Sequence, residues 1–355
     1  MMRIAVIGAT GVVGRECLAL LGDAAFPVDR VVPVASPRSA GRDLAAEFGL
    51  SRALDPVTTL DRLDPGEVDV AILCAGAELS RQAAERLAGA GVLVVDNSSA
   101  FRGRPDVPLV VPQVNGQVLR QRPPSGLVAN PNCSTIQLVR ALHPLHALAG
   151  LDRVVLATYQ AASGGGVRGL AELAEASAAF LADPGRPPEE PGRFGQPLAF
   201  NLIPEIGPAD VSGFSHEERK LVAESRRILG LPLLPLTATA VRVPVFHCHS
   251  EAVHVTLREP VTAAAVEDVL AAAPGLRVHR RGGGPGYPMP RTACVRPEDR
   301  ALVHVGRVRV DPDDPRAVWL WIVADNLWVG AALNAVQAVG LAVGYGWLGG
   351  TSAAA

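Results

Sequence analysis

The chain has 355 residues, with 33 basic and 35 acidic side chains and a formal net charge of −2. That length allows two domains with a large core, and the near balance of charge excludes a strongly basic nucleic-acid binder or an anionic-membrane binder. The five cysteines show no CxxC spacing, so they predict neither a disulfide framework nor a zinc site. We expect a cytoplasmic protein, because the N-terminus lacks a signal-peptide pattern and no stretch of about 20 apolar residues occurs.

The N-terminal residues predict a dinucleotide cradle. Residues 3–7 form a continuous apolar run, as in a strand of a covered parallel sheet. The turn Gly8-Ala9-Thr10-Gly11-Val12-Val13-Gly14 follows, and we expect a helix over residues 15–21. Glycines in such a turn let a pyrophosphate approach the helix N-terminus. The GxxGxxG spacing is weak by itself, but its place after the first strand favours a cradle over an ordinary turn.

The end of the second expected strand, residues 30–35, bears on the choice of cofactor. Folds that bind NAD often carry an acidic residue here for the ribose hydroxyls. This chain has Ser36-Pro37-Arg38-Ser39 instead. A guanidinium with two hydroxyls suits a 2′-phosphate, which predicts NADP rather than NAD. The alternative is a solvated Arg38 in a loop.

Two further buried strands are expected at residues 68–75 and 92–95, with an amphipathic helix over residues 79–90 between them. The last of these strands runs into a polar segment that ends at Arg102. Ligands bind at strand carboxyl ends in such sheets, so Arg102 is well placed to meet a substrate anion. Considered alone, it would be a surface arginine.

The segment Asn130-Pro131-Asn132-Cys133-Ser134-Thr135 predicts a cysteine at the start of a helix. A short apolar strand, residues 127–129, precedes it, and apolar residues at helical spacing follow. Asn132 is a plausible N-cap. Unpaired backbone N–H groups there favour a thiolate and can hold an oxyanion. The alternative for an isolated cysteine is a buried, inert thiol.

The remaining chain predicts a second α/β region. A strand at 154–158 leads to Tyr159-Gln160-Ala161-Ala162-Ser163-Gly164-Gly165-Gly166, whose glycines let backbone approach a flat ligand. Residues 183–197 are rich in Pro, Gly and charge and predict a surface loop. Residues 240–253 alternate like one strand, which would put Arg242 and His249 on opposite faces unless the register shifts. Further strands are expected at 303–311 and 319–323, an apolar helix at 331–343, and disorder at 351–355.

Two side-chain pairs have competing interpretations. Lys220 is the only lysine, and it lies three residues after Glu217 in a helix for which Ser215 is a possible N-cap. The pair is either an ordinary intrahelical ion pair or a place where a compact ammonium is required. His247 and His249 would share a strand face, but without carboxylate ligands they are a poor metal signal. We therefore predict no metal site.

Together these segments resemble the aspartate-semialdehyde dehydrogenase family. Each match is weak alone, but they occur in family order over almost the whole chain. The matching segments are GATGVVG at 8–14, SPRSAG at 36–41, NSSAFR at 97–102, PNCST at 131–135, TYQAASGGG at 158–166, HEERK at 216–220, RVPVFHCHSEAV at 242–253 and DNLWVGAALNAVQ at 325–337.

The resemblance implies an α/β fold with a Rossmann-type parallel-sheet NADP domain, residues 1–132 plus 331–355. An α+β catalytic and dimerisation domain, residues 133–330, would lie between. It implies NADPH-dependent reductive dephosphorylation of L-aspartyl 4-phosphate to L-aspartate 4-semialdehyde, in lysine, threonine and methionine biosynthesis. A homodimer or homotetramer is expected, with small-molecule substrate and phosphate as ligands and no nucleic acid or membrane partner.

The resemblance also implies roles for individual residues. Cys133 would be the acyl-accepting nucleophile, His249 the general acid/base, and Gln160 would orient the acyl group. Substrate would be bound by four residues: Arg242 and Glu217 for its carboxylate and amine, Arg102 and Lys220 for phosphate. The expected cofactor contacts are Gly8, Thr10, Gly11, Val12, Val13, Ser36, Arg38, Ser39, Ser163, Gly164 and Asn326.

The chain departs from the family pattern at three places. The family usually has Glu where this chain has Gln113, and Gly where it has Cys248. It usually has a basic pair where this chain has Trp328 and Val329. None of these changes removes a nucleophile, base or substrate clamp.

Two alternatives are kept. One is another acyl reductase, acting on N-acetylglutamyl phosphate or an acyl-CoA, for which the amine-binding carboxylate of Glu217 would serve no purpose. The other is a non-enzymatic paralogue that binds nucleotide, suggested by Trp328 and Val329.

Overall fold

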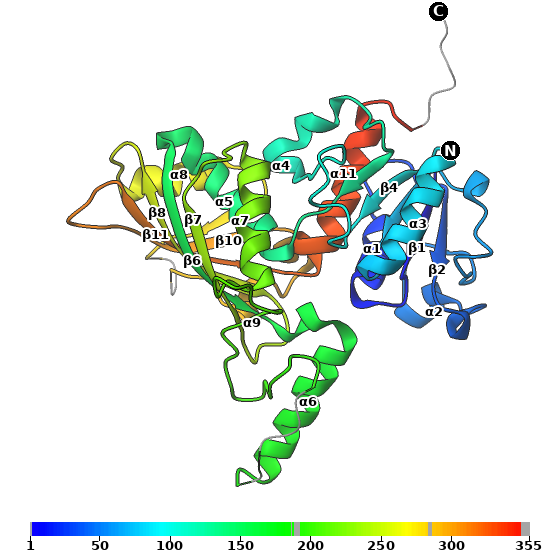
Figure 1. Ribbon diagram of the computed structural model, residues 1–355, viewed down its shortest axis with the longest axis horizontal. Helices are drawn as coiled ribbons and strands as arrows, with labels where there is room; N and C mark the ends of the chain where they lie inside the picture. The colour runs from blue at the N-terminus through cyan, green and yellow to red at the C-terminus, as the bar shows by residue number, and fades with distance from the viewer. Residues whose placement is uncertain (1, 186, 188–191, 283–285, 349–355) are drawn as a thin grey trace, which may run out of the picture. The chain divides into compact units, whose positions relative to one another are not determined.

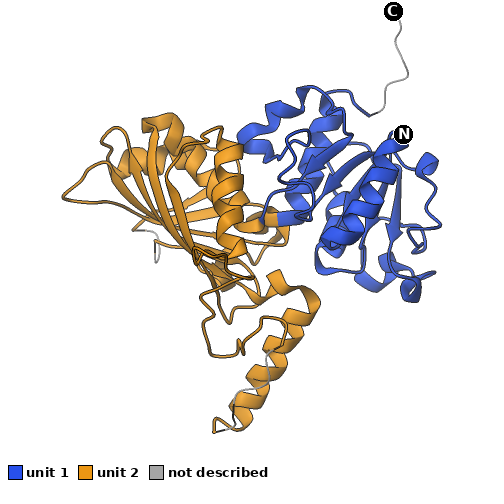
Figure 2. Cartoon of the chain, viewed as in Figure 1, with its two compact units in different colours: residues 1–132, 331–355 blue, residues 133–330 orange. Residues whose placement is uncertain are grey.

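The computed structural model describes residues 2–185, 187, 192–282 and 286–348. The chain divides into two compact units, Met1–Asn132 with Ala331–Ala355 and Cys133–Gly330 (Figure 2). The expected disorder of residues 351–355 concerns a segment outside the described residues.

The first unit contains a five-stranded parallel sheet in the order β2-β1-β3-β4-β5. Its strands are almost fully buried, which explains why they are continuous apolar runs rather than alternating ones. The order reverses at β1, so the chain after β1 lies at the switch point where such sheets bind ligands. The strands are β1 (Arg3–Ile7), β2 (Arg30–Val34), β3 (Val70–Leu73), β4 (Leu93–Asp96) and β5 (Leu127–Ala129).

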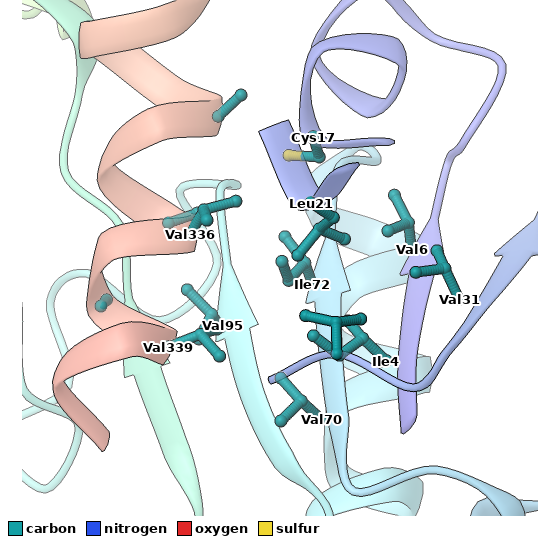
Figure 3. Close-up of a cluster of buried hydrophobic side chains, with 14 of the residues drawn as sticks. Ile4, Val6, Cys17, Leu21, Val31, Val70, Ile72, Val95, Val336 and Val339 are labelled. Atoms are coloured by element: carbon teal, nitrogen blue, oxygen red, sulfur yellow. The ribbon is translucent and has the colours of Figure 1, made fainter. Parts of the chain in front are cut away.

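The C-terminal helix α11 (Leu333–Gly344) completes the core of this unit (Figure 3). Val336 and Val339 of α11 belong to the same buried cluster as Ile72 and Val95 of the sheet. The last part of the chain is therefore needed to cover a sheet built by the first part. The other helices are α1 (Val12–Gly22), α2 (Leu44–Phe48), α3 (Ala77–Gly89), α4 (Pro112–Asn115), η1 (Pro37–Ser39), η2 (Pro65–Glu67) and η3 (Gly116–Arg120).

The second unit is built on a six-stranded mixed sheet, β7-β6-β8-β11-β10-β9 (Figure 1). Strands β6, β7 and most of β8 alternate between buried and more exposed residues, because the long helices cover one face of the sheet. The helices α5 and α7 pack against each other, and both contact the sheet. The strands are β6 (Leu151–Gln160), β7 (Leu236–Arg242), β8 (His249–Leu257), β9 (Leu276–His279), β10 (Val303–Val310) and β11 (Ala317–Ala324).

The helices of this unit include the two that carry candidate site residues. Helix α5 (Cys133–Ala149) begins at Cys133, which confirms the predicted place of that thiol in a first turn. Helix α7 (His216–Leu229) begins after Ser215, which is its N-cap as predicted. The others are α6 (Gly166–Ala182), α8 (Ala263–Ala272), α9 (Pro290–Ala293), α10 (Pro297–Arg300) and η4 (Ala162–Gly165), and η5 (Trp328–Ala332) precedes α11.

The prediction of one strand over residues 240–253 was wrong. β7 ends at Arg242 and β8 begins at His249, with a connection of residues 243–248 between them. Pro244 lies in that connection, and Cys248 has φ of +71°, so neither fits a continuous strand. His247 lies in the connection and is exposed, whereas His249 is buried, so these two residues do not share a face. No helix within the described ranges has both the length and the apolar character needed to span a membrane.

Candidate active site

Strand ends bring the expected catalytic residues to one edge of the second unit's sheet. β6 and β7 are parallel, and Gln160 is paired with Arg242 at their last residues. β8 runs antiparallel to both β6 and β11, so its first residue, His249, lies at the same edge and is paired with Ala324. Asn326 follows directly after β11. Positions that are distant in sequence thus meet because of the strand order.

The peptide of Ala161 connects two of these side chains. Its N–H donates to Nδ1 of His249 at 3.0 Å, and its carbonyl accepts from Nη1 of Arg242 at 2.8 Å. Burial, and then the Arg242 charge, lower the pKa of His249 well below its usual value. A neutral imidazole whose Nδ1 accepts must carry its proton on Nε2. Nε2 is buried and has no hydrogen-bond partner in the described part of the chain, so it is an unused donor.

Arg242 is held between backbone and an aromatic ring. A Cβ at Gly164 would lie 2.7 Å from Nη1 of Arg242, so glycine is required there for this close approach. On another side, the Phe194 ring centroid is 5.3 Å from the guanidinium carbon. Burial lowers the pKa of Arg242, while Cys133 and then Glu217 act to raise it. Arg242 lines a cavity of about 580 Å³ with Gly164, Phe194, Ile203 and residues 205–208.

Helix α7 contributes an acid and an amine to the same region. Glu217 is buried, and its Oε1 accepts from Nε2 of Gln160 at 3.3 Å. Nζ of Lys220 lies 3.4 Å from the other oxygen of Glu217. The i,i+3 ion pair is therefore present, and its carboxylate also contacts Gln160. An ordinary surface ion pair would lack that second contact.

Cys133 is the first residue of α5 and is partly exposed. A Cβ at Gly330 would lie 2.6 Å from Cβ of Cys133, so the glycine leaves room for this side chain. The thiol is close enough to Arg242 to influence the pKa of its guanidinium. All five cysteines are thiols rather than disulfides. The second unit thus brings Cys133, His249, Gln160, Arg242, Glu217 and Lys220 into one region.

The expected nicotinamide-side residues also lie in this unit. The Ser163 hydroxyl donates to Oδ1 of Asn326 at 3.0 Å, and the backbone N–H of Cys248 donates to the same oxygen at 3.0 Å. Both side chains are buried. Gly164 follows in η4, against Arg242.

The glycine-rich turn of the first unit fits the predicted cradle. Gly8 has φ of +85°, and a Cβ there would lie 2.5 Å from the Cys74 carbonyl oxygen. A Cβ at Gly14 would lie 2.2 Å from the Gly8 carbonyl oxygen. The helix α1 begins at Val12 with Gly11 as N-cap, without a side-chain cap or an acidic residue in its first turn. Its first backbone N–H groups, next to Thr10 and Val13, suit a pyrophosphate.

Two other expected anion contacts lie in the first unit. Ser36 and Arg38 are exposed in the turn after β2, and Ser39 is buried. No ion pair involves Arg38 in the described residues, and Oγ of Ser39 accepts from Arg42 at 3.4 Å. Arg102 is partly buried, and it donates to the carbonyls of Asn130 and Asn97 at 2.8 and 2.9 Å.

The departures from the family pattern have structural partners. Nε2 of Gln113 donates to Oε1 of Gln337 at 2.8 Å within the first unit. The Arg300 guanidinium lies 4.3 Å from the Trp328 ring centroid. A cation therefore contacts Trp328, which replaces one of the family's two basic residues. Val329 is buried. No group of three or more metal-ligating side chains occurs among the described residues.

Several residues of the site were not predicted. Ala161 acts through its peptide, which has no side-chain signal in the sequence. Phe194 and Arg193 lie in the segment predicted only as a surface loop, although Nε of Arg193 donates to the Gly165 carbonyl at 3.3 Å. Gly330 could have been singled out as a glycine at the start of an apolar helix.

Two family models match the chain. A semialdehyde dehydrogenase NAD-binding domain matches residues 3–122, and a semialdehyde dehydrogenase dimerisation domain matches residues 142–329. Among curated relatives, the aspartate-semialdehyde dehydrogenase of Synechocystis sp. is 40% identical over 347 residues, covering 98% of this chain and 99% of that protein. The enzyme of Legionella pneumophila is 40% identical and covers 95% and 94%.

Solved structures give the same result. Aspartate semialdehyde dehydrogenase II of Vibrio cholerae, complexed with ASA, has a TM-score of 0.89 and 40% identity, covering 97% of this chain and 98% of that one. An aspartate semialdehyde dehydrogenase with NADP from Candida albicans has a TM-score of 0.74 at 24% identity, which shows the fold alone.

Proposed function

The chain belongs to the aspartate-semialdehyde dehydrogenase family, and we propose that it catalyses NADPH-dependent reductive dephosphorylation of L-aspartyl 4-phosphate to L-aspartate 4-semialdehyde. The reaction would proceed through a thioester on Cys133 and serve lysine, threonine and methionine biosynthesis. The fold and family place the protein among nicotinamide-dependent oxidoreductases.

The arrangement of Arg242 and Glu217 carries this proposal. The Arg242 guanidinium lies close enough to Cys133 and Glu217 for both to raise its pKa. The guanidinium would pair with the carboxylate of an amino acid, and the Glu217 carboxylate with its amine. Arg242 presents a planar fork suited to a carboxylate. Glu217 would be wasted on a substrate with an acylated amine, which disfavours N-acetylglutamyl phosphate.

The chemistry follows from the residues. The Cys133 thiolate attacks the acyl carbon, and the carbon–oxygen bond to phosphate breaks. Inorganic phosphate departs, and the acyl group remains on Cys133 as a thioester. Arg102 and Lys220 are proposed to bind that phosphate. Reduction gives a hemithioacetal, which releases the aldehyde when the carbon–sulfur bond breaks. Gln160 would hold the acyl oxygen.

His249 is proposed to act first as a hydrogen-bond donor. Its Nδ1 accepts from the Ala161 N–H, so the neutral ring presents Nε2–H to the substrate oxygen. The low pKa caused by burial keeps this ring neutral at physiological pH. The nearby charge of Arg242 and the N-terminus of α5 would then stabilise the thiolate of Cys133.

Each unit, taken by itself, carries residues that we propose as cofactor contacts. The nicotinamide supplies the hydride when it is bound. A side chain at Gly8 would collide with the Cys74 carbonyl, so glycine keeps this turn tight beside the N-terminus of α1, where we propose that the pyrophosphate binds. Arg38, Ser36 and Ser39 are proposed to bind a 2′-phosphate, because no acidic residue follows β2. Thr10, Val12, Val13, Ser163, Gly164 and Asn326 would complete the contacts.

We also propose a homodimer in the cytoplasm. The second unit matches a dimerisation-domain model, and the face of its sheet opposite α5 and α7 carries exposed Val155 and Trp319. A dimer through this face would bury them.

The decisive experiment traps the acyl group. Protein is mixed with aspartate semialdehyde and NADP⁺ without phosphate, and peptides are analysed by mass spectrometry. We expect an acyl adduct on Cys133, which phosphate then releases, and no adduct in Cys133→Ser.

Robust turnover by Cys133→Ala would contradict the thioester. Turnover of N-acetylglutamyl semialdehyde or an acyl-CoA, but not of the aspartyl compound, would favour the other acyl reductases. Tight NADP binding without any adduct would favour a non-enzymatic paralogue.

A further inference from the structure

A pair of thiols lies directly behind the proposed acid/base residue. Cys248 precedes His249 and is buried, and Cys294 follows α9 and is partly exposed. Both belong to one small cluster, in which Cys294 packs against Cys248, Ala293 and Val323. Their side chains are hydrogen-bonded to each other. The two cysteines therefore lie in one cluster of the fold, although 46 positions separate them in sequence, the difference between 294 and 248.

The backbone of Cys248 supports the active-site region. Its φ of +71° lies in the left-handed region, which is uncommon for a residue with a side chain. Its N–H donates to Oδ1 of Asn326, which also accepts from Ser163. A displacement of Cys248 would reach His249 through the chain and Asn326 through this hydrogen bond.

The two thiols have different chemical character. The hydrogen bond from Cys248, with a further contribution from His304, lowers the pKa of Cys294 to about 6. The same hydrogen bond and burial raise the pKa of Cys248. Cys294 is thus the more acidic and more exposed thiol, and Cys248 is its buried, less acidic partner. That combination is typical of an attacking and a resolving cysteine.

Another thiol pair shows that contact alone does not produce this difference. Sγ of Cys17 lies 3.6 Å from Sγ of Cys74 in the first unit. The hydrogen bond with Cys74, together with burial, raises the pKa of Cys17, and Cys17 is fully buried. This pair serves as an internal comparison for the experiment.

We propose that Cys294 is a site of reversible thiol modification, which closes a disulfide with Cys248 when the protein meets a low-molecular-weight disulfide. The Cys294 thiolate attacks one sulfur of the small disulfide, and the other sulfur leaves as a thiolate. The Cys248 sulfur then attacks Cys294 and displaces the second thiolate, which takes the Cys248 proton. In total, two protein thiols are oxidised and one small disulfide is reduced to two thiols.

The disulfide is expected to reduce activity. Bond formation brings the sulfurs to about 2 Å from each other, which must shift Cys248 or α9. Cys248 is joined to His249 and bonded to Asn326, so these groups would move with it. This consequence rests on the proposed function, whereas formation of the disulfide does not.

The first test measures the disulfide itself. Cys133→Ser protein, which lacks the competing thiol, is incubated with oxidised glutathione near neutral pH, alkylated and digested. We expect a disulfide-linked pair of peptides containing Cys248 and Cys294, and its loss when Cys294→Ser is added. Cys74→Ser in the same background should leave that product unchanged. Absence of the Cys248–Cys294 peptide pair would overturn the proposal.

The second test measures its effect. Wild type and Cys294→Ser are assayed before and after the same oxidation, and then after dithiothreitol. Oxidation through Cys133 alone would lower both activities equally. We expect wild type to lose at least about tenfold more activity than Cys294→Ser, because small displacements of catalytic groups have large effects on rate, and to recover on reduction. Equal losses of activity in wild type and Cys294→Ser would contradict the proposed effect of the disulfide on catalysis. If reduced wild type does not turn over the semialdehyde, the proposed function fails, while the mass result still decides the disulfide.

Discussion

At the scale of single residues, the site depends on groups that share supports. The Ala161 peptide fixes both His249 and Arg242, and Oδ1 of Asn326 holds both Ser163 and Cys248. Such shared contacts set the orientation of catalytic groups without touching substrate. Replacing one supporting group should therefore alter substrate binding and reaction rate, even though that group does not touch the substrate.

Phe194 is expected to orient Arg242. Its ring lies against the guanidinium and also packs on Gly165 and Gly169. Phe194→Leu keeps an apolar side chain but removes the aromatic face, which contributes about 0.5–2 kcal/mol to such contacts. We expect KM for aspartate semialdehyde to rise by about 2- to 30-fold from that range, with kcat little changed. Phe194→Tyr is the control and should behave like wild type; equal KM in all three would contradict this role.

Glu251 should make stability depend on pH. It is fully buried on the same face of β8 as His249, and burial raises its pKa well above the usual value, with only Gln137 opposing. A carboxyl whose pKa is raised in the folded state stabilises the fold below its unfolded pKa, about 4.3. This stability is lost as pH rises toward the folded pKa. Glu251→Gln mimics the protonated acid.

The measurement is thermal unfolding of wild type and Glu251→Gln at about pH 5 and about pH 8. We expect the melting temperature of the variant relative to wild type to increase between the two. Glu175→Gln, at an exposed position on α6, provides the matched change of charge. Two results would argue against a buried neutral carboxyl. One is a melting-temperature difference between Glu251→Gln and wild type that is the same at both pH values, and the other is an equal change with pH in Glu175→Gln.

At the scale of elements, helix ends position the reactive groups. α5 starts at Cys133, α1 starts beside the glycine turn, and α7 starts just before Glu217. Glu218 closes the capping box with Ser215, and its other oxygen accepts from the Ala240 N–H of β7 at 2.9 Å. One carboxylate therefore sets both the start of α7 and its place against the strand that carries Arg242.

Ser215→Ala should weaken both stability and substrate binding. Loss of an N-cap costs about 1 kcal/mol, and this cap lies two residues before Glu217. Thr262→Ala removes a comparable cap from α8, where Thr262 accepts from Ala265 at 3.2 Å. We expect both variants to melt at lower temperature, but only Ser215→Ala to raise KM for the semialdehyde. A rise in KM of the same size in both would indicate a general effect of stability.

At the scale of the whole molecule, the second unit covers one face of its sheet with the long helices α5 and α7, and the opposite face contacts the short helix α9 near Val323. His254 stacks against Trp319 with centroids 4.6 Å apart, and Tyr159 lies 5.5 Å from Trp321. Trp319 retains 41% of its exposure, which is high for a large aromatic residue on a sheet. Exposed aromatic surface of this kind is typical of an interface between subunits.

Trp319→Arg should therefore weaken the proposed homodimer. A charged side chain at the centre of an apolar interface would be buried without a partner. Sedimentation velocity should show wild type as a dimer and the variant shifted toward monomer. Leu79→Arg on α3 adds the same charge at a similarly exposed site in the first unit, and it should remain dimeric. A monomeric wild type, or a dimeric Trp319→Arg, would exclude this face.

The sequence by itself determined the elements whose signals are local. Continuous apolar runs predicted β1 and β5, and Ser215 predicted the start of α7, since burial and capping leave a local mark on composition. The glycine turn predicted a helix from residue 15, but α1 begins at Val12, within that turn. The family resemblance added the expected roles of distant residues.

Only the tertiary structure decided which of those residues meet. It divided residues 240–253 into two strands, because a proline and a left-handed cysteine interrupt the alternation. It also placed the Ala161 peptide between His249 and Arg242 and brought Cys294 to Cys248. Such contacts arise from strand order and backbone direction, which no short stretch of amino acids encodes.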